Sequence, residues 1–496
     1  MNVLVPFPVV VPLLAAGLSL ALHRRAALQR ALGIAVMTMT LGATVILLVQ
    51  VQAEGVISVQ LGGWPAPIGI TLVADLFSAI MLVVSTTMVL AVLVYAIGSP
   101  VTADEGQVFH PVYLVLAAGV SASFLTGDLF NLFVAFEVML VSSYVLITLG
   151  GRPEQVRSGM TYVVISLLAS TLFVTAVALV YAATGTVNMA HLAGRLADIP
   201  EGPRTALGLL LLVVFGVKAA IFPLFFWLPD SYPTAPAPVT AIFAGLLTKV
   251  GVYAIIRTQT LLFPSDGPST LLLAIAGATM LVGVLGAIAQ DDVKRILSFH
   301  IVSQIGYMVL GLGLFSVAGI AGAIFYIVHH VVVKTALFLV SGLIENAAGT
   351  GALHRLGGLL RSTPVVAWLF LLPALSLAGL PPFSGFVAKL ALVQAGLDLD
   401  RYVEVGLSLF VSLLTLFSMA KIWAGVFWGA PDQPPPVAGV GSARLASPRL
   451  MVTPTVALVV ASLAIAGAAG PLYDLGRRAA DTLVDRSLYV EAVLGR

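Results

Sequence analysis

The chain has 496 residues, of which 59% are hydrophobic and only 9% are charged. A soluble globular protein carries about 25% charged residues, so these few charges cannot cover a water-exposed surface. The net charge of +2 argues against a nucleic-acid partner, and the lack of cysteine excludes disulfides and thiolate metal sites. Apolar runs of about 20 residues recur along the chain, and each is long enough to cross a hydrocarbon core of about 30 Å. The sequence therefore predicts an all-α polytopic membrane protein.

Windowed hydropathy predicts about fourteen transmembrane helices joined by short loops. They cover residues 3–22, 31–52, 72–97, 110–127, 129–149, 160–183, 205–228, 239–261, 270–288, 296–314, 317–343, 363–397, 402–428 and 451–470. The first lacks a basic leading region and a cleavage site, so it is interpreted as a membrane helix and not as a signal peptide. Residues 428–450, rich in Pro and Gly, predict a flexible connector. The charged and apolar residues after Gly470 predict an amphipathic helix that lies on the membrane or on a neighbouring subunit.

The positive charges of the short loops predict how the chain is oriented across the membrane. If the first link, with Arg24 and Arg25, is cytoplasmic, the two sides of the membrane carry different numbers of Lys and Arg. The cytoplasmic side then also holds Arg152, Arg157, Lys294, Arg295, Arg355, Arg361, Arg444 and Arg449. The opposite side holds Arg195, Arg204, Arg257 and Arg401. Both termini are therefore expected on the outer side.

Lysine and arginine are distributed differently along the chain. Five of the six lysines fall inside apolar spans, namely Lys218, Lys249, Lys334, Lys389 and Lys421. The eighteen arginines fall in loops, at span edges or in the tail. Arginine keeps its proton at any accessible pH, whereas a desolvated lysine can lose it near neutrality. Ionisable groups at membrane depth mark ion or proton routes, so this pattern indicates changes of protonation within the membrane.

Two of these lysines lie beside proline breaks in an apolar span. Lys218 precedes Pro223, and Lys389 follows Pro381 and Pro382. The two spans are five apart, so they cross the membrane in opposite directions, as the broken helices of inverted repeats do. We therefore predict two inverted five-helix repeats, in which Lys249 corresponds loosely to Lys421. The predicted units are residues 1–100 (helices 1–3), 101–262 (helices 4–8), 263–429 (helices 9–13) and 430–496 (linker, last helix and amphipathic tail).

Glu137 is the only acidic residue deep within a predicted span. A buried carboxylate needs a cationic partner or must stay protonated, and Lys218 is the best candidate partner. An ion pair that can separate works as a switch, because a buried ammonium without its carboxylate gives up its proton more readily. The alternative is a static pair that holds two helices together. Four other carboxylates, expected near span ends where water reaches them, are Asp75, Asp128, Glu345 and Glu404.

Further ionisable groups extend the predicted route. Lys249 is interpreted as a relay, and His330 shares a helix face with Lys334, four residues on, while His329 points about 100° away. Lys389 would end the relay. The alternatives are snorkelling lysines and core histidines bonded to backbone or hydroxyl groups. No metal site and no cofactor are predicted.

Three other groups of residues are interpreted as structural and not as parts of the proton route. Lys421, beside Trp423 and Trp428, is explained by snorkelling. Lys294 and Arg295, next to two aspartates, predict a solvated charge cluster. The prolines of 229–238 predict a rigid turn that orients the helices of Lys218 and Lys249.

Four ordered segments carry a family resemblance. They are KAAIFPLFFWLPDSYPTAPAPVTAIFAGLLTKVGVYAIIR (218–257), DVKRILSFHIVSQIGYM (292–308), HHVVVKTALFLVSG (329–342) and LAGLPPFSGFVAKLAL (377–392). Together they resemble the antiporter-like membrane subunits shared by respiratory complex I, membrane-bound hydrogenases and Mrp-type cation/proton antiporters. Lys389 disfavours the complex I subunits of this family that have a glutamate at the corresponding position. The segments 3–16 and 329–345 look most similar to the D subunits of the Mrp branch.

The resemblance implies a fourteen-helix subunit of a hetero-oligomeric sodium/proton antiporter in the bacterial inner membrane. Its partners would be the other subunits, the lipid bilayer, protons and sodium. The family's functional positions fall on Glu137, Lys218, Lys249, His329, His330, Lys334 and Lys389. Such a chain is a secondary transporter subunit, and a translocase enzyme only within a redox complex.

Two alternatives stay open. In the first, the same relay serves as the proton-pumping module of a complex I or hydrogenase type redox complex. In the second, the chain is a membrane scaffold whose lysines only fix assembly, which predicts that Lys249→Ala and Lys389→Ala leave transport intact.

Overall fold

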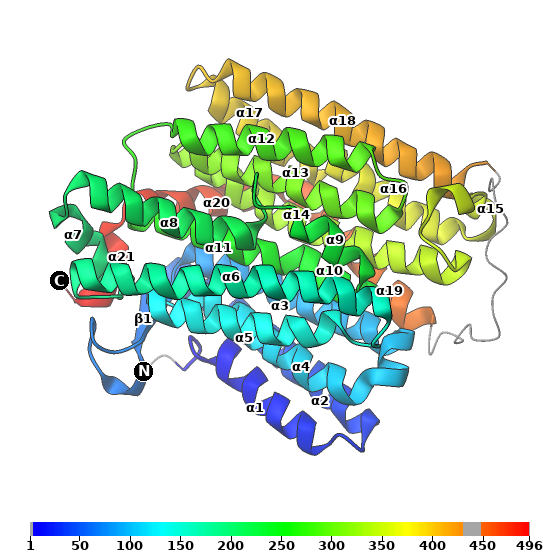
Figure 1. The fold of residues 1–496 in the computed structure, drawn as a ribbon, viewed down its shortest axis with the longest axis horizontal. Coiled ribbons are helices and arrows are strands. Elements are labelled where there is room, and N and C mark those ends of the chain that lie inside the picture. The colour runs from blue at the N-terminus through cyan, green and yellow to red at the C-terminus, as the bar shows by residue number, and fades with distance from the viewer. Residues whose placement is uncertain (1–2, 430–447, 496) are drawn as a thin grey trace.

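A computed structural model of the chain describes residues 3–429 and 448–495, and of residues 102–106 the backbone only. Within these ranges the molecule is a bundle of helices that run along its longest axis (Figure 1). Twelve segments of the described chain are long and apolar enough to cross a membrane. They are α2 (Ala26–Glu54), α3 (Leu76–Gly98), α4 (Pro100–Leu125), α5 (Leu129–Ile147), α6 (Pro153–Thr184), α8 (Glu201–Ala219), the joined helix Ala237–Leu261, α12 (Thr270–Ile288), α13 (Val293–Gly313), α14 (Val317–Ala348), α18 (Tyr402–Phe427) and α19 (Pro448–Gly467). The predicted all-α polytopic architecture is confirmed.

Three shorter apolar helices complete the bundle: α1 (Phe7–Ala21), α16 (Pro364–Ala378) and α17 (Ser384–Leu397). Helix α1 lies where the first span is predicted, and α16 with α17 lie where the twelfth is predicted. The arrangement is therefore compatible with the predicted fourteen spans.

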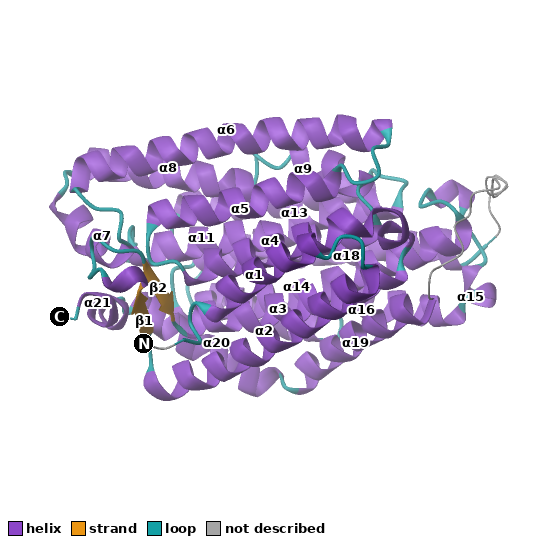
Figure 2. Ribbon diagram, turned by 90° about the horizontal axis from the view of Figure 1, so that it is seen from below, coloured by secondary structure: helices purple, strands orange, loops and turns teal. Residues whose placement is uncertain are grey.

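The remaining elements are short. The helices are α7 (Met189–Arg195), α9 (Trp227–Ser231), α15 (Leu359–Ser362), α20 (Ala469–Val484) and α21 (Ser487–Leu494), while the joined helix Ala237–Leu261 begins with α10 (Ala237–Ile242) and ends with α11 (Thr248–Leu261). Single tighter turns are η1 (Leu61–Gly63), η2 (Leu196–Asp198), η3 (Tyr232–Thr234) and η5 (Leu353–Arg355), and η4 (Phe243–Leu247) is a wider π-helical turn between α10 and α11. Strands β1 (Ile57–Gln60) and β2 (Thr71–Ala74) pair antiparallel, with Ile57 opposite Ala74. Figure 2 shows this hairpin beside α7 and α21 at one end of the bundle.

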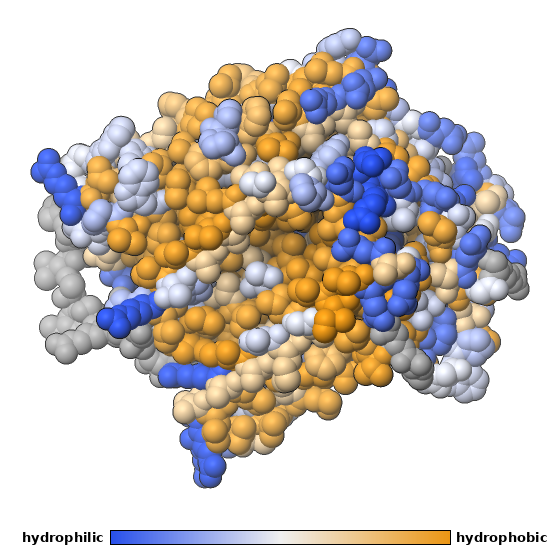
Figure 3. Space-filling model, turned by 180° about the vertical axis from the view of Figure 1, so that it is seen from behind, coloured by the Kyte–Doolittle hydropathy of each residue, from blue (hydrophilic) through white to orange (hydrophobic). Residues whose placement is uncertain are grey.

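On the face shown in Figure 3, apolar side chains cover the middle of the molecule, and hydrophilic residues gather toward its two ends. Such an apolar middle is what a hydrocarbon core requires of the surface that it contacts. Inside the bundle, α11, α13 and α14 are buried over almost their whole length. Ionisable residues in the middle of these helices, such as Lys249, His300 and Lys334, are therefore shielded from both lipid and bulk water.

Two spans are broken at the predicted places. Helix α8 ends at Ala219, Ala220 adopts a left-handed backbone conformation with φ 59°, and α9 starts only at Trp227. The second break separates α16 from α17 at residues 379–383, where Gly379 has φ 86°. Both breaks contain proline, which has no backbone N–H to continue a helical ladder.

The described ends of the chain lie together, at the end of the bundle that carries the hairpin and α21 (Figure 1). The tail differs from its prediction, because α20 packs on its own chain. Tyr473 of α20 meets Phe325 of α14, and Gly476 lies over the backbone of Ala321. One face of this helix therefore packs on the chain's own bundle and does not lie on the membrane. Of the predicted flexible connector, residues 430–447 lie outside the described residues.

Candidate functional site

Helix α6 lies between Glu137 and Lys218. The Ser170 hydroxyl of α6 donates a hydrogen bond to the Glu137 carboxylate, and the Lys218 ammonium donates to the Ser166 carbonyl at 3.3 Å. These two serines are one helical turn apart, a rise of about 6 Å along the axis. Glu137 and Lys218 interact electrostatically, but no ion pair within 4 Å joins them among the described residues. The structure thus brings the predicted partners to neighbouring points of α6 without direct contact.

Lys218 is 6% exposed and borders a small internal cavity of about 10 Å³. Tyr162, Ser166 and Trp227 also line this cavity. A cavity of this size holds about one water molecule when polar groups surround it. The hydroxyl and ammonium groups here provide such polar partners, so the cavity suits a water that bridges Lys218 to its neighbours.

Lys249 is fully buried on α11. Its ammonium donates to the Ala244 carbonyl at 2.6 Å and to the Thr248 hydroxyl at 3.1 Å. Ala244 belongs to the π-helical turn η4, a kind of distortion that is frequent at functional sites. The wider turn presents a backbone carbonyl to the lysine, so Lys249 is held by neutral acceptors and forms no ion pair with a carboxylate of the described residues.

The middle of α14 carries polar atoms without a protein partner. Both ring nitrogens of His330 and the ammonium of Lys334 are buried and form no hydrogen bond within the described chain. His330 lies within electrostatic range of Lys249 and Lys334. Buried polar groups in native proteins are almost always satisfied by protein or by ordered water. These atoms therefore need water molecules that connect them.

His329 makes a different contact. Its Nδ1 lies 2.8 Å from the Ser384 hydroxyl at the start of α17, and Ser384 is 3.2 Å from Ser376 of α16. His329 thus joins α14 to the second helix break, whereas His330 faces the lysines.

Sequence reasoning missed two residues of α13. His300 is fully buried, its Nε2 is 2.9 Å from the Ser418 hydroxyl, and it lies within electrostatic range of Lys334 and Lys389. Gln304, one turn further on, accepts a hydrogen bond from the Tyr326 hydroxyl. The sequence did contain a sign of them, because a histidine and a glutamine four residues apart in an apolar helix share one face. These residues bridge the stretch between the α14 cluster and Lys389.

Lys389 reaches back across the second break. Its ammonium donates to the carbonyls of Leu377 and Ala378 at 3.1 and 3.0 Å, and to the Ser412 hydroxyl at 2.7 Å. These carbonyls are at the C-terminus of α16, where helical carbonyls lack partners and a cation is favoured. It also lies 5.0 Å from the centre of the Tyr307 ring. Lys389 is thereby anchored to the half-helix that the break creates.

Lys421 lies apart from this row. It forms a 2.8 Å ion pair with Asp291 and donates to the carbonyls of Ile288 and Gln290 at the end of α12. The hydrogen bond from Lys421 holds the pKa of the exposed Asp291 carboxyl below its usual value. This position at a bundle end agrees with the interpretation that Lys421 snorkels.

Three charge assignments made from the sequence are wrong. Lys294, predicted to be solvated, is 5% exposed and forms a 2.8 Å ion pair with Glu345. Asp75, predicted to be reached by water, is 2% exposed, and Arg257, predicted to lie in a loop, is buried on α11. The physical reason is the same in each case, since a charge paired across the bundle can be buried at a span end.

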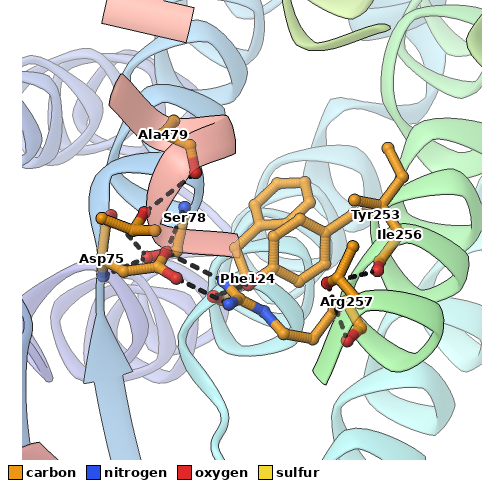
Figure 4. A network of polar contacts seen from close by, with 9 residues as sticks. Asp75, Ser78, Phe124, Tyr253, Ile256, Arg257 and Ala479 are labelled. Atoms are coloured by element: carbon orange, nitrogen blue, oxygen red, sulfur yellow. Dashed lines mark hydrogen bonds and ion pairs between the residues drawn. The ribbon is translucent and has the colours of Figure 1, made fainter. Parts of the chain in front are cut away.

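Figure 4 shows the Asp75–Arg257 network. The guanidinium binds both carboxylate oxygens, with Nη1 to Oδ2 at 2.6 Å and Nη2 to Oδ1 at 2.8 Å. Asp75 also caps α3 by accepting from the Ser78 backbone N–H, and Tyr253 donates to the Phe124 carbonyl. The Tyr489 ring of α21 lies 5.2 Å from the guanidinium. Arg257 is thus paired with a carboxylate through both of its oxygens, whereas the Lys334 ammonium forms no hydrogen bond within the described chain.

The comparisons with known proteins agree on one family. Residues 126–415 match the family described as NADH:quinone oxidoreductase/Mrp antiporter, TM. The chain is 45% identical over 498 residues to the D subunit of the Na(+)/H(+) antiporter of Alkalihalophilus pseudofirmus, covering 100% of each chain. It is 37% identical over 505 residues to the D subunit of the Bacillus subtilis Na(+)/H(+) antiporter, again with 100% coverage of both.

Two solved structures resemble the whole chain, each with a TM-score of 0.90 and 100% coverage of both chains. One is the Mrp complex from Dietzia sp. DQ12-45-1b, at 36% sequence identity. The other is the membrane-bound sulfane sulfur reductase, an archaeal respiratory membrane complex, at 27% identity. The family match covers more than half of the chain, and the antiporter D subunits match its full length. This chain therefore belongs to the NADH:quinone oxidoreductase/Mrp antiporter family of membrane subunits, within the branch of the Mrp D subunits.

Proposed function

We propose that the chain is the proton-translocating subunit of a multisubunit sodium/proton antiporter in a bacterial inner membrane, with both termini on the outer side. Relatives matched over the full length are named as D subunits of Na(+)/H(+) antiporters, and one structural neighbour is part of an Mrp complex. The partners of the chain are accordingly the other subunits of such a complex, the surrounding lipid, protons and sodium.

One observation carries the proposed route: buried amine and imidazole groups follow one another through the core, and His330 and Lys334 at its centre have no side-chain hydrogen bond to any described residue. Protons pass from the Glu137–Lys218 pair to Lys249, then to His330 with Lys334, and on to Lys389. Ordered water fills the gaps, because the side chains are not in direct contact and a bridging water is nearly as good as a direct hydrogen bond. His329, bonded to Ser384, couples this relay to the second helix break.

The first pair acts as the switch. Glu137 and Lys218 are held by serines one turn apart on α6, so a small shift of α5 or α8 changes their separation. Moving the carboxylate away removes the charge that stabilises the ammonium in a low-dielectric interior, and the lysine then passes on its proton. In the predicted inverted repeats, residues 101–262 and 263–429, Lys389 takes the corresponding place at the second break.

The second candidate is the proton-pumping subunit of a redox complex. The fold of the archaeal sulfane sulfur reductase supports it, with the same TM-score as the Mrp complex but a lower identity, 27% against 36%. Both candidates use the same relay and differ in partners. Subunits that co-purify with the chain distinguish them, since iron–sulfur or flavin proteins would identify the redox complex.

The test is sodium-driven antiport, followed with a pH-sensitive dye in vesicles. Glu137→Ala and Lys218→Ala should each abolish the dye response while the complex still assembles, because either change removes one member of the switch. Lys421→Ala is the matched control, since it removes a lysine that lies outside the row. A normal dye response from either of the first two variants would refute the proposal.

A further inference from the structure

Two neighbouring cavities on the outside of α8 and α12 have contrasting linings. The first, of about 410 Å³, is polar and includes Arg204, Asp266 and Arg486. The second, of about 470 Å³, is almost entirely apolar and includes Phe222, Pro223 and Leu224 of the first helix break. Leu209, Leu212 and Leu271 line both cavities. The two cavities adjoin along these leucines, and together they are called the groove here, polar at one end and apolar at the other.

The polar end lies where α8 begins, beside α7 and α21 at the terminal end of the bundle (Figure 1). From Arg204 to the end of α8 at Ala219 the helix rises about 22 Å. One leaflet of a bilayer, headgroup region included, is roughly 20–22 Å thick, which is half of the 40–45 Å total. The groove thus runs from the headgroup level of one leaflet to the middle of the bilayer.

The charges at the polar end match a phosphodiester. Two guanidiniums and one carboxylate line it, so the lining carries a net charge of +1. Arg204 is half-buried, and within the described chain its guanidinium forms no hydrogen bond or ion pair. Arg486 makes two long bonds of 3.4 Å, both through Nη1, to the carbonyls of Ala193 and Leu261. Both guanidiniums therefore keep donors for phosphate oxygens.

The apolar end is open. Leu209 is 44% exposed, Leu271 48% and Phe222 36%. These side chains line the groove on both sides, from the headgroup level to the helix break. An acyl chain fits such a groove, because it is apolar along its whole length and continues inward from a headgroup.

We propose that this groove binds one glycerophospholipid with a single net negative charge, its phosphate on Arg204 and Arg486 and one acyl chain reaching the break at residues 221–224. The lipid would then contact the segment that follows Lys218. This site is separate from the row of lysines and histidines, and its existence does not depend on the function proposed above.

The test is lipid binding by the full-length chain, purified in detergent with its co-purifying subunits and analysed by native mass spectrometry. Dioleoylphosphatidylglycerol should bind about tenfold more tightly than dioleoylphosphatidylcholine, and the double variant Arg204→Gln/Arg486→Gln should lose this preference. Arg478→Gln is the matched control, because Arg478 is exposed and lies outside the groove lining. Equal affinities of the unaltered protein for the two lipids, or a preference that survives in the double variant, would overturn the proposal.

The apolar half of the groove has its own test. Leu271→Trp fills the junction of the two cavities and should weaken the binding of both lipids. Leu285→Trp places the same ring on an equally exposed position of α12 outside the groove and should leave binding unchanged. Inorganic phosphate should not displace the bound lipid. Equal lipid binding by the two tryptophan variants, or full displacement by inorganic phosphate, would mean that the groove does not hold an acyl chain.

Discussion

Two adjacent histidines of α14 occupy different environments. His329 is bonded to the Ser384 hydroxyl, whereas neither ring nitrogen of His330 has a protein partner in the described chain. A histidine kept for packing is expected to hydrogen-bond to its surroundings, because an unsatisfied buried polar group destabilises the fold. His329 therefore fits a positioning role, and His330 fits a group that exchanges protons through water.

This contrast predicts that replacing His330 mainly affects transport, whereas replacing His329 mainly affects the stability of the protein. His330→Leu should change the melting temperature little, since it removes a side chain with no protein hydrogen bond, but it should abolish antiport. His329→Leu should lower the stability by about 1–3 kcal/mol, because it leaves Ser384 without this partner. Thermal unfolding of the purified protein and the vesicle assay check both outcomes. Full antiport activity of the His330→Leu variant would show that His330 is a structural residue and not a proton-transfer group.

At the scale of elements, the spacing between α8 and α11 determines how close Lys218 comes to Lys249. A side-chain carbon on Gly251 would lie 2.6 Å from the Ala219 nitrogen and 2.9 Å from the Lys218 carbonyl carbon. Only glycine permits this approach of two backbones. The packing of these helices, together with the π-helical turn η4, is what brings the first two lysines of the row near each other.

Gly251→Ala should therefore push α11 away from the end of α8. We expect a loss of about 1–3 kcal/mol of stability from the overpacked contact, together with reduced antiport. Gly406→Ala is the control, because nothing lies within 4 Å of a carbon added there and helical alanine is favoured over glycine. Melting curves and dye responses of the two variants give the comparison. If Gly251→Ala leaves the melting curve and the dye response unchanged, the close contact between α8 and α11 does not limit stability or antiport.

At the scale of the whole molecule, the Asp75–Arg257 pair joins parts of the chain that are far apart in sequence. Asp75 precedes α3, Arg257 belongs to α11, and the Tyr489 ring of α21 lies over the guanidinium. The pair is buried and bidentate, so each of the two charges is stabilised by the other. It fixes the terminal end of the bundle, away from the row of lysines.

Removing one partner should leave an uncompensated buried charge. Arg257→Gln is expected to cost about 3–5 kcal/mol of stability, and the double variant Asp75→Asn/Arg257→Gln should recover part of that loss. The exposed pair Arg295–Asp230 is the control, where Arg295→Gln should cost at most about 1 kcal/mol. Thermal unfolding of these three variants and of the single variant Asp75→Asn measures this. A double variant as unstable as the sum of its single changes would contradict the coupling.

Local properties of the chain determined the membrane architecture. Apolar runs long enough to cross a bilayer, proline within two spans, and lysines inside apolar segments are all visible in short windows, so the helices and both breaks were predictable. The residues of the relay were also named from the sequence, although their role stays a prediction.

Only the tertiary structure decided which distant groups meet. Ser166 and Ser170 between Glu137 and Lys218, His300 and Gln304 on α13, and the burial of Lys294 depend on contacts between helices that no local pattern encodes. The Asp75–Arg257 pair spans 182 positions, and α20 turned out to cover its own α14. The physical reason is that hydropathy measures whether a segment prefers apolar surroundings, whereas a polar side chain is stabilised by its particular partner, which packing alone supplies.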